Sequence, residues 1–128
     1  MFRRELSRTL EERLREPRSF IQVVMGPRQT GKTTAIKQAV KATELPVRVA
    51  SADSAIELGA DWIELEWRQA RNMAERGTKA VLVLDEIQKV AQWSQTVKRL
   101  WDEDSWNDTP LLVILSGSSS LLIGSGLS

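Results

Sequence analysis

The stretch FIQVVMGPRQTGKTTAIKQAVKAT, residues 20–43, decides the fold. It begins with FIQVVM, a nearly continuous apolar run rich in β-branched residues, which predicts a strand covered on both faces. It ends with apolar residues at helical spacing, Ile36, Ala39 and Val40. Between these two parts, GPRQTGKT (26–33) matches the pattern G-x-x-x-x-G-K-[ST]. The sequence therefore predicts a strand, a glycine-containing loop and a helix in direct succession.

A loop in this position is suited to binding phosphate. Successive backbone N–H groups and the positive end of the helix dipole converge on an anion, and glycine lets the chain turn without a Cβ in the way. Lys32 adds a positive charge for the terminal phosphates, and Thr33 offers a hydroxyl to Mg²⁺. The alternative is a glycine turn with a capping threonine and a solvated lysine. The residues we expect to bind the nucleotide are Gly26, Pro27, Arg28, Gln29, Thr30, Gly31, Lys32, Thr33 and Thr34.

Composition limits the chemistry available to the chain. Its 128 residues are enough for one compact domain, and 41% hydrophobic with 27% charged residues is ordinary for a soluble globular protein. Cysteine and histidine are both absent, which excludes thiol redox chemistry, zinc sites and imidazole catalysis. No apolar run approaches the roughly 20 residues of a membrane span, and the N-terminus lacks a secretory pattern. We expect a cytoplasmic protein that contacts no membrane.

Strands and helices alternate along the whole chain. An amphipathic helix over 1–16 precedes an α/β core over 20–120. Parallel strands need long crossovers, so alternation with helices predicts a parallel sheet covered by helices on both faces, a three-layer arrangement. Within that core the later elements are a strand at 45–51, a helix at 61–75, a strand at 80–86, a helix from Trp93, an acidic solvated loop at 102–110 and a strand from Leu111.

The strand VLVLDE, 81–86, delivers two carboxylates at its C-terminal end. Ligands of an open parallel sheet gather beyond the carboxyl ends of its strands, so Asp85 is expected to face the phosphate loop. We expect Asp85 to hold Mg²⁺, mostly through water. Glu86, one residue further on, is placed to orient or deprotonate an attacking water. The alternative for both is an acidic helix start, which the helix dipole favours.

The fourth strand runs into SGSSS, 116–120. A hydroxyl at the end of this strand is in a position to bond the γ-phosphate or the attacking water. Ser116 is the first candidate for this catalytic role and Ser118 the second. The alternative is a polar turn whose side chains bond its own backbone.

Taken together, these motifs resemble a known family. GPRQTGKTT, VLVLDEIQKV, Trp93, VKRLWDED and LSGSSSLL are similar to the AAA+ ATPases of the AAA_14 group, whose full-length members typically carry a DUF4143 domain. The resemblance covers about residues 15–128. It implies a P-loop NTPase of the AAA+/ASCE type with sheet order 5-1-4-3-2, ATP and Mg²⁺ as ligands, Walker A and Walker B motifs, and Ser116 as sensor 1. Gln88 belongs to the family signature, and the residues alone do not reveal its task.

The end of the chain departs from the family pattern. All 18 Lys and Arg residues lie at or before Arg99, whereas residues 100–128 carry four acids and no base. Such ATPases normally have a fifth strand, a helical lid and arginines that stabilise phosphoryl charge. We therefore expect a truncated core with four strands, ordered 1-4-3-2, and slow turnover.

Three functions fit the motifs. The first is an Mg-dependent ATPase domain that couples its nucleotide state to the motion of domains not included here, and that forms a homo-oligomer when full length. The second is a nucleotide-regulated switch or scaffold with little hydrolysis. The third, a small-molecule kinase, is disfavoured by the acid after Asp85, which suits water activation. The sequence names neither a protein nor a nucleic-acid partner, and the base preference stays open outside the family resemblance.

Two weaker signals favour structural roles. Arginines and glutamates interleave along the first helix, which suits ion pairing on a solvated face better than nucleic-acid binding. The tryptophans have the spacing of packed residues, and without basic neighbours they do not form a base-stacking platform. We expect all of them to pack in the core: Trp62, Trp67, Trp93, Trp101 and Trp106.

Overall fold

The computed structural model describes residues 2–26, 31–54 and 59–118. A helix is followed by four strands that alternate with three helices, in the predicted order. The helices are α1 (Phe2–Arg15), α2 (Lys32–Thr43), α3 (Ala60–Met73) and α4 (Trp93–Trp106), and the strands are β1 (Gln22–Met25), β2 (Val47–Ser51), β3 (Ala80–Asp85) and β4 (Leu111–Gly117). Short 3₁₀ turns follow β2, α3 and β3.

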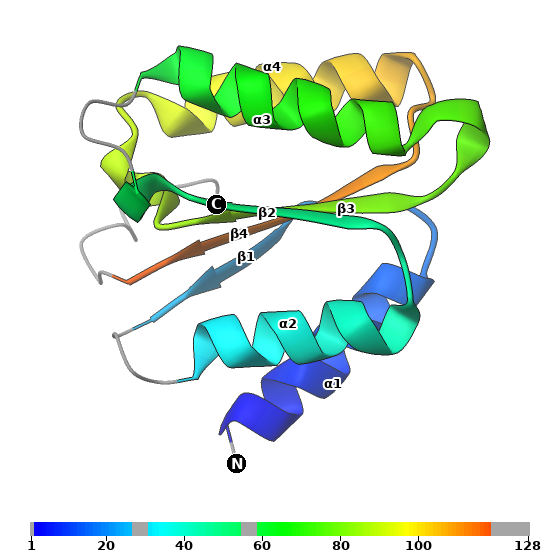
Figure 1. Ribbon diagram of the computed structural model, residues 1–128, viewed down its shortest axis with the longest axis vertical. Coiled ribbons are helices and arrows are strands. Elements are labelled where there is room, and N and C mark those ends of the chain that lie inside the picture. The colour runs from blue at the N-terminus through cyan, green and yellow to red at the C-terminus, as the bar shows by residue number, and fades with distance from the viewer. Residues whose placement is uncertain (1, 27–30, 55–58, 119–128) are drawn as a thin grey trace.

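The four strands form one parallel sheet in the order β1-β4-β3-β2, as expected. Helices α1 and α2 lie on one face, and α3 and α4 lie on the other (Figure 1). This is a three-layer α/β fold. The chain passes from β1 at one edge of the sheet to β2 at the other through α2, which packs on β3 and β4.

Side chains of the central strands alternate between two cores. Leu82 and Leu84 of β3 join the core under α3 and α4, whereas Val81 and Val83 join the core over α1 and α2. A strand has a side-chain period of two, so a strand buried on both faces must be apolar at every position. Burial on both faces explains why the sequences of β3 and β4 contain continuous apolar runs. The first helix is amphipathic, as predicted, and Leu10 and Leu14 are buried.

Strand β1 departs from the prediction that both its faces are covered. Val24 is buried against α1 and α2, but the side chain of Val23 is 39% exposed, and Phe20, before the strand, is exposed. The strand lies at the edge of the sheet, and α3 and α4 pack over the strands beyond it (Figure 1). Hydrophobicity alone does not distinguish an edge strand from a central one.

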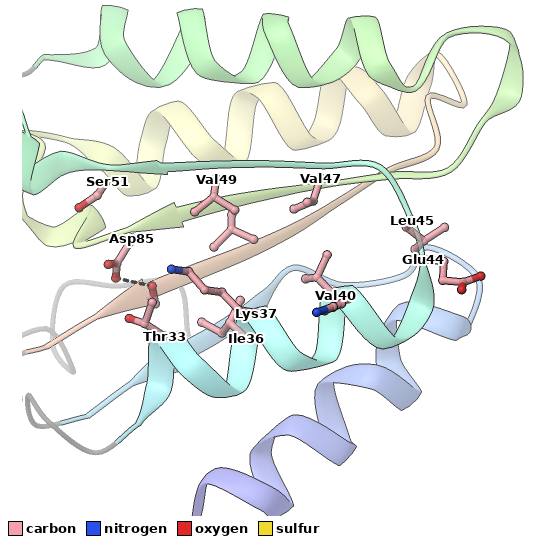
Figure 2. A pocket seen from close by; sticks show the side chains of 13 residues that line it. Thr33, Ile36, Lys37, Val40, Glu44, Leu45, Val47, Val49, Ser51 and Asp85 are labelled. Atoms are coloured by element: carbon pink, nitrogen blue, oxygen red, sulfur yellow. Dashed lines mark hydrogen bonds between the residues drawn. The ribbon is translucent and has the colours of Figure 1, made fainter.

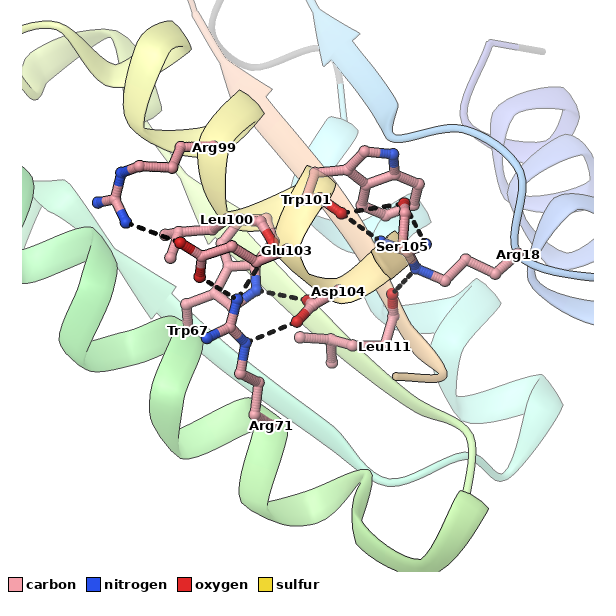
Figure 3. A network of polar contacts seen from close by, with 10 residues as sticks. All are labelled: Arg18, Trp67, Arg71, Arg99, Leu100, Trp101, Glu103, Asp104, Ser105 and Leu111. Carbon is pink, nitrogen blue, oxygen red and sulfur yellow. Dashed lines mark hydrogen bonds and ion pairs between the residues drawn. The ribbon is translucent and has the colours of Figure 1, made fainter. Parts of the chain in front are cut away.

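The acidic segment 102–110 is not the solvated loop that its composition predicted. Residues up to Trp106 form the last turns of α4, and Asp104 is 1% exposed. Pairs at i,i+4 support the helix there, Lys98 with Asp102 and Arg99 with Glu103. The carboxylate of Asp104 accepts a 2.8 Å hydrogen bond from the indole of Trp67 and pairs with Arg71 at 2.7 Å (Figure 3). This segment therefore ties α4 to α3.

Arg18 is a second tie, between the segment before β1 and α4. Its guanidinium lies 3.5 Å from the ring centroid of Trp101 and donates to the carbonyl oxygens of Leu111 and Trp101 and to the hydroxyl of Ser105 (Figure 3). An arginine that stacks and bonds in this way is held by the fold. On α1, Arg15 pairs with Glu11 at 3.0 Å, as the interleaved charges predicted.

The tryptophans divide into buried and exposed positions. Trp67 and Trp93 are buried, and Trp62 and Trp101 are partly buried against the same core. Trp106, at the end of α4, is 87% exposed, so the expectation of core packing is wrong for it. Trp106 is the last residue of α4.

Among the described residues, no helix combines the length and the apolar character that a membrane span requires.

Candidate phosphate-binding site

The carboxyl ends of the four strands meet at one edge of the sheet. Met25 is in register with Gly117, and Ser51 is in register with Asp85. The backbone N–H of Gly26 donates to the carbonyl oxygen of Gly117 at 3.3 Å, which holds the start of the loop against β4. The strand ends that precede the predicted phosphate loop and the acid doublet therefore share this edge.

Two ends of the predicted phosphate loop are described. Gly31 has φ 85°, a left-handed conformation that glycine adopts without strain, and its carbonyl oxygen accepts the first helical bond, from the N–H of Ala35, at 2.9 Å. Lys32 begins α2, and its side chain is only 7% exposed. A Cβ built on Gly26 would lie 3.8 Å from Cδ of Lys32, so the lysine stem runs beside the first glycine. Pro27, Arg28, Gln29 and Thr30 lie outside the described residues.

A cavity of about 460 Å³ opens beside the start of α2. Thr33 and Asp85, from two different elements, line one end of it (Figure 2). Ser116 of β4 also lines the cavity and bonds Asp85. Its middle is apolar, walled by residues of α2 and by Val47 and Val49 of β2. Thr33 and Asp85 were both predicted as magnesium-site residues, and the fold brings them together. Thr34, which was also predicted to bind the nucleotide, does not line this cavity.

Asp85 is held by two donors. The hydroxyl of Ser116 donates to Asp85 Oδ1 at 2.7 Å, and the backbone N–H of Glu86 donates to the same oxygen at 3.0 Å. Ser116 is 1% exposed and lies within β4, the strand next to β3. Hydrogen bonds to a carboxylate are short and strong, so this oxygen is fixed in direction.

Glu86 sits differently from its neighbour. Its backbone is left-handed, with φ 55°, at the start of the 3₁₀ turn Ile87–Lys89, and its side chain is buried. The hydroxyl of Ser118 donates to Glu86 Oε1 at 2.8 Å, and the side-chain amide of Gln88 donates to the same oxygen at 3.0 Å. The two acids therefore have different partners, because Asp85 bonds Ser116 and Glu86 bonds Ser118. An acidic helix start, the alternative for both residues, does not explain these side-chain contacts.

Most of the chain matches one protein family. The family model described as an AAA domain, AAA_14, matches residues 18–128. The chain belongs to the AAA_14 family. Its class is therefore that of AAA+ nucleotide-binding ATPases, which are P-loop NTPases. No curated protein sequence is similar enough to this chain to count as a match.

The fold of this AAA domain recurs in a solved structure. The crystal structure of Cdc6p from Pyrobaculum aerophilum is similar, with a TM-score of 0.69 and 16% sequence identity over 97% of this chain. The AAA domain spans 40% of the length of that protein. At this identity the likeness is evidence for the fold alone.

Two residues of the AAA domain's site were not predicted, and a third, Gln88, was named without a task. Ser51 ends β2 and lines the cavity, and Lys37 lines it from α2 (Figure 2). Both had a signal in the sequence: Ser51 ends a predicted parallel strand, and Lys37 follows Thr33 by four residues and so shares its helix face. Gln88 was named as part of the family signature, but nothing in the sequence indicated its task, because its contact with Glu86 depends on the left-handed backbone at Glu86.

The donor set of the AAA domain suits magnesium that is shared with a phosphate. Within residues 2–26, 31–54 and 59–118, no group of three or more histidine, cysteine or acidic side chains gathers that could hold a metal ion. The hydroxyl of Thr33 and the carboxylate of Asp85 are hard oxygen ligands at one end of the cavity. Mg²⁺ keeps several waters and is usually bound by one or two carboxylates plus substrate phosphates. The residues present fit that pattern of binding.

Proposed function

We propose that this AAA domain binds Mg²⁺-ATP at the carboxyl edge of its sheet and hydrolyses it. The observation that carries the proposal is the shared cavity end, where Thr33 and Asp85 meet beside the start of α2. The start of α2 supplies Lys32 beside the first glycine of the loop, and the end of β3 supplies Asp85. The preference for ATP rests on the family rather than on a base-contacting residue.

Each residue then has a role set by its place. Lys32 and the backbone N–H of Gly31 bind the β- and γ-phosphates, since both lie at the N-terminus of α2. Thr33 and Asp85 would hold the metal ion. When bound, Mg²⁺ would neutralise part of the negative charge that develops on the phosphate oxygens. Ser116 fixes the orientation of Asp85 and is the candidate sensor of the phosphate.

Glu86 is the proposed general base. A general base must lie within hydrogen-bond reach of the proton that it accepts, and Glu86 directly follows the metal-binding acid. It would take a proton from water as the water oxygen attacks the γ-phosphorus and ADP leaves. Burial of Glu86 shields its carboxylate from bulk water, so this reaction is confined to a water inside the site.

We further propose that the nucleotide state drives the motion of other domains, in a homo-oligomer. The chain spans 40% of the length of Cdc6p. An arginine that stabilises the transferring phosphoryl group contributes about 10³ to 10⁵ in rate in related NTPases. We expect this chain alone to hydrolyse ATP slowly, and a neighbouring subunit or domain to supply the arginine.

Glu86→Gln tests the proposal directly. The amide keeps the shape of the side chain but accepts no proton, so ATP binding should persist and turnover should fall by roughly 10² or more. Binding is measured by calorimetry, and turnover by phosphate release. Equal slow turnover in the wild type and in this variant would favour the nucleotide-regulated switch over the ATPase.

The cavity favours one second candidate, phosphoryl transfer to a small acceptor. Its apolar middle adjoins Asp85, so a small molecule bound there would lie next to the reacting phosphate. Such an acceptor would replace water as the nucleophile only if it displaced water from the site. Analysis of the products distinguishes the two functions, because hydrolysis releases free phosphate and a kinase transfers it to a hydroxyl.

A further inference from the structure

Three side chains from two separate segments meet at one carboxylate oxygen. Glu86 Oε1 accepts from Ser118 Oγ at 2.8 Å and from Gln88 Nε2 at 3.0 Å. Gln88 Nε2 also donates to Ser118 Oγ at 3.4 Å, which closes a triangle. Glu86 and Gln88 follow β3, whereas Ser118 follows β4. The triangle thus spans the ends of two neighbouring strands.

The arrangement is costly for Gln88 and for the backbone. The second polar atom of the amide, Gln88 Oε1, is buried and accepts no hydrogen bond within the described part of the chain. Leaving a buried acceptor unpaired costs free energy, as does a left-handed backbone at a residue other than glycine. Glu86 has that backbone, with φ 55°. Such costs persist where the surrounding structure enforces a geometry that function needs.

We propose that Gln88 and Ser118 are positioning residues that fix the Glu86 carboxylate for water activation. This inference rests on the proposed function, in which Glu86 is the general base. Because the two donors come from different directions, they hold the Glu86 carboxylate in one orientation. A misplacement of about 1 Å in a reacting group can cost 10²-fold in rate. The clamp that Gln88 and Ser118 form on Glu86 therefore acts on the chemical step rather than on nucleotide binding.

The two strand-end serines then serve the two acids separately. Ser116 bonds Asp85, and Ser118, two residues later, bonds Glu86. The clamp therefore has a counterpart on the metal-binding acid, and removal of each hydroxyl should affect a different step. Loss of the Ser116 contact should weaken the binding of Mg²⁺-ATP, whereas loss of the Ser118 contact should slow turnover.

The kinetic test uses Gln88→Met, which keeps the length of the side chain but removes its N–H donor, and Ser118→Ala. We expect kcat to fall about 10- to 100-fold in each, with the affinity for Mg²⁺-ATP within about twofold of wild type in calorimetry. Ser118→Thr keeps the hydroxyl and should restore kcat. Gln69→Met is the matched control, because Gln69 is exposed on α3. An unchanged or higher kcat in Gln88→Met overturns the proposal, as does an equal loss in binding.

A second measurement needs no turnover. The side-chain amide proton resonances of Gln88 should differ from those of exposed Gln69 in the wild type, and Glu86→Ala should move them toward the Gln69 positions. If Glu86→Ala does not move these resonances and the wild type hydrolyses ATP, the clamp is wrong and the proposed function stands. If they move but neither ATP binding nor hydrolysis is found in the wild type, the contact is real and the proposed function, with the catalytic role of the clamp, is wrong.

Discussion

The hydroxyl of Ser116 donates a 2.7 Å hydrogen bond to Asp85 Oδ1, across the boundary between β4 and β3. Both side chains lie where parallel strands end, so the bond depends on the register of the sheet. The backbone N–H of Glu86 donates to the same oxygen. The candidate metal-binding acid is thus held in one direction by its neighbouring strand and by its own chain.

Ser116→Ala should weaken the binding of Mg²⁺-ATP about tenfold. A hydrogen bond to a charged group contributes about 1.5–3 kcal/mol, and a tenfold change in affinity corresponds to about 1.4 kcal/mol. Calorimetry with ATP in the presence of Mg²⁺ and in the presence of a chelator measures the effect. We expect the loss only with Mg²⁺ present. An equal loss in both conditions would mean that Ser116 acts on the nucleotide or on the fold rather than through Asp85.

The alternation of strands and helices could be predicted because each pattern has one dominant physical cause. Apolar runs such as β3 are buried on both faces, and α2 begins directly after Gly31, whose backbone is left-handed. The sheet order came from resemblance to a family, since strand pairing depends on contacts between residues distant in sequence. The exposure of Val23 was not predictable, because the letters of an edge strand do not reveal which helices cover it.

Asp104 makes a prediction about stability and pH. Burial, the largest influence, raises the pKa of Asp104 above its ordinary value of 3.8, although Trp67, Arg71 and Arg18 oppose this rise. The folded protein therefore favours the protonated carboxyl more than the unfolded chain does. Its contribution to stability is fully present below pH 3.8 and is lost as the pH rises through the folded-state pKa.

Asp104→Asn removes this titration while keeping the shape of the side chain. Urea unfolding of both proteins at several pH values isolates the effect. The stability of the wild type relative to the variant should fall as the pH rises from below 3.8 toward neutral. A relative stability that instead rises with pH would mean that the ion pair with Arg71 outweighs the burial of Asp104.

Trp67 and Trp106 form a matched pair for testing the core. Trp67 is fully buried and donates to Asp104 at 2.8 Å, whereas Trp106 is 87% exposed at the end of α4. Trp67→Ala should lower the free energy of unfolding by about 3–5 kcal/mol, since it opens a large cavity. Trp106→Ala should change it by less than about 0.5 kcal/mol. Denaturant unfolding measures both, and similar losses in the two variants would contradict this packing.

At the site, the residues on the strand ends were predictable and the contacts between them were not. The position of Asp85 could be predicted from an apolar run that ends in an acid, because the ligand-binding residues of a parallel sheet lie at the carboxyl ends of its strands. The separation of the two acids, with Ser116 on one and Ser118 on the other, depends on the left-handed turn at Glu86. A backbone angle of that kind leaves no periodic pattern in the sequence, and neither does the contact of Gln88.

The most direct test of the central claim is calorimetry with Mg²⁺-ATP on the wild type and on Lys32→Ala. Lys32 is a buried cation at the start of α2, where the proposed phosphate site lies. The wild type should give saturable heat, and the variant should give none at the same concentrations. Equal binding by both proteins, or no heat with the wild type for either adenine or guanine triphosphate, would contradict the claim that this edge of the sheet binds a nucleotide.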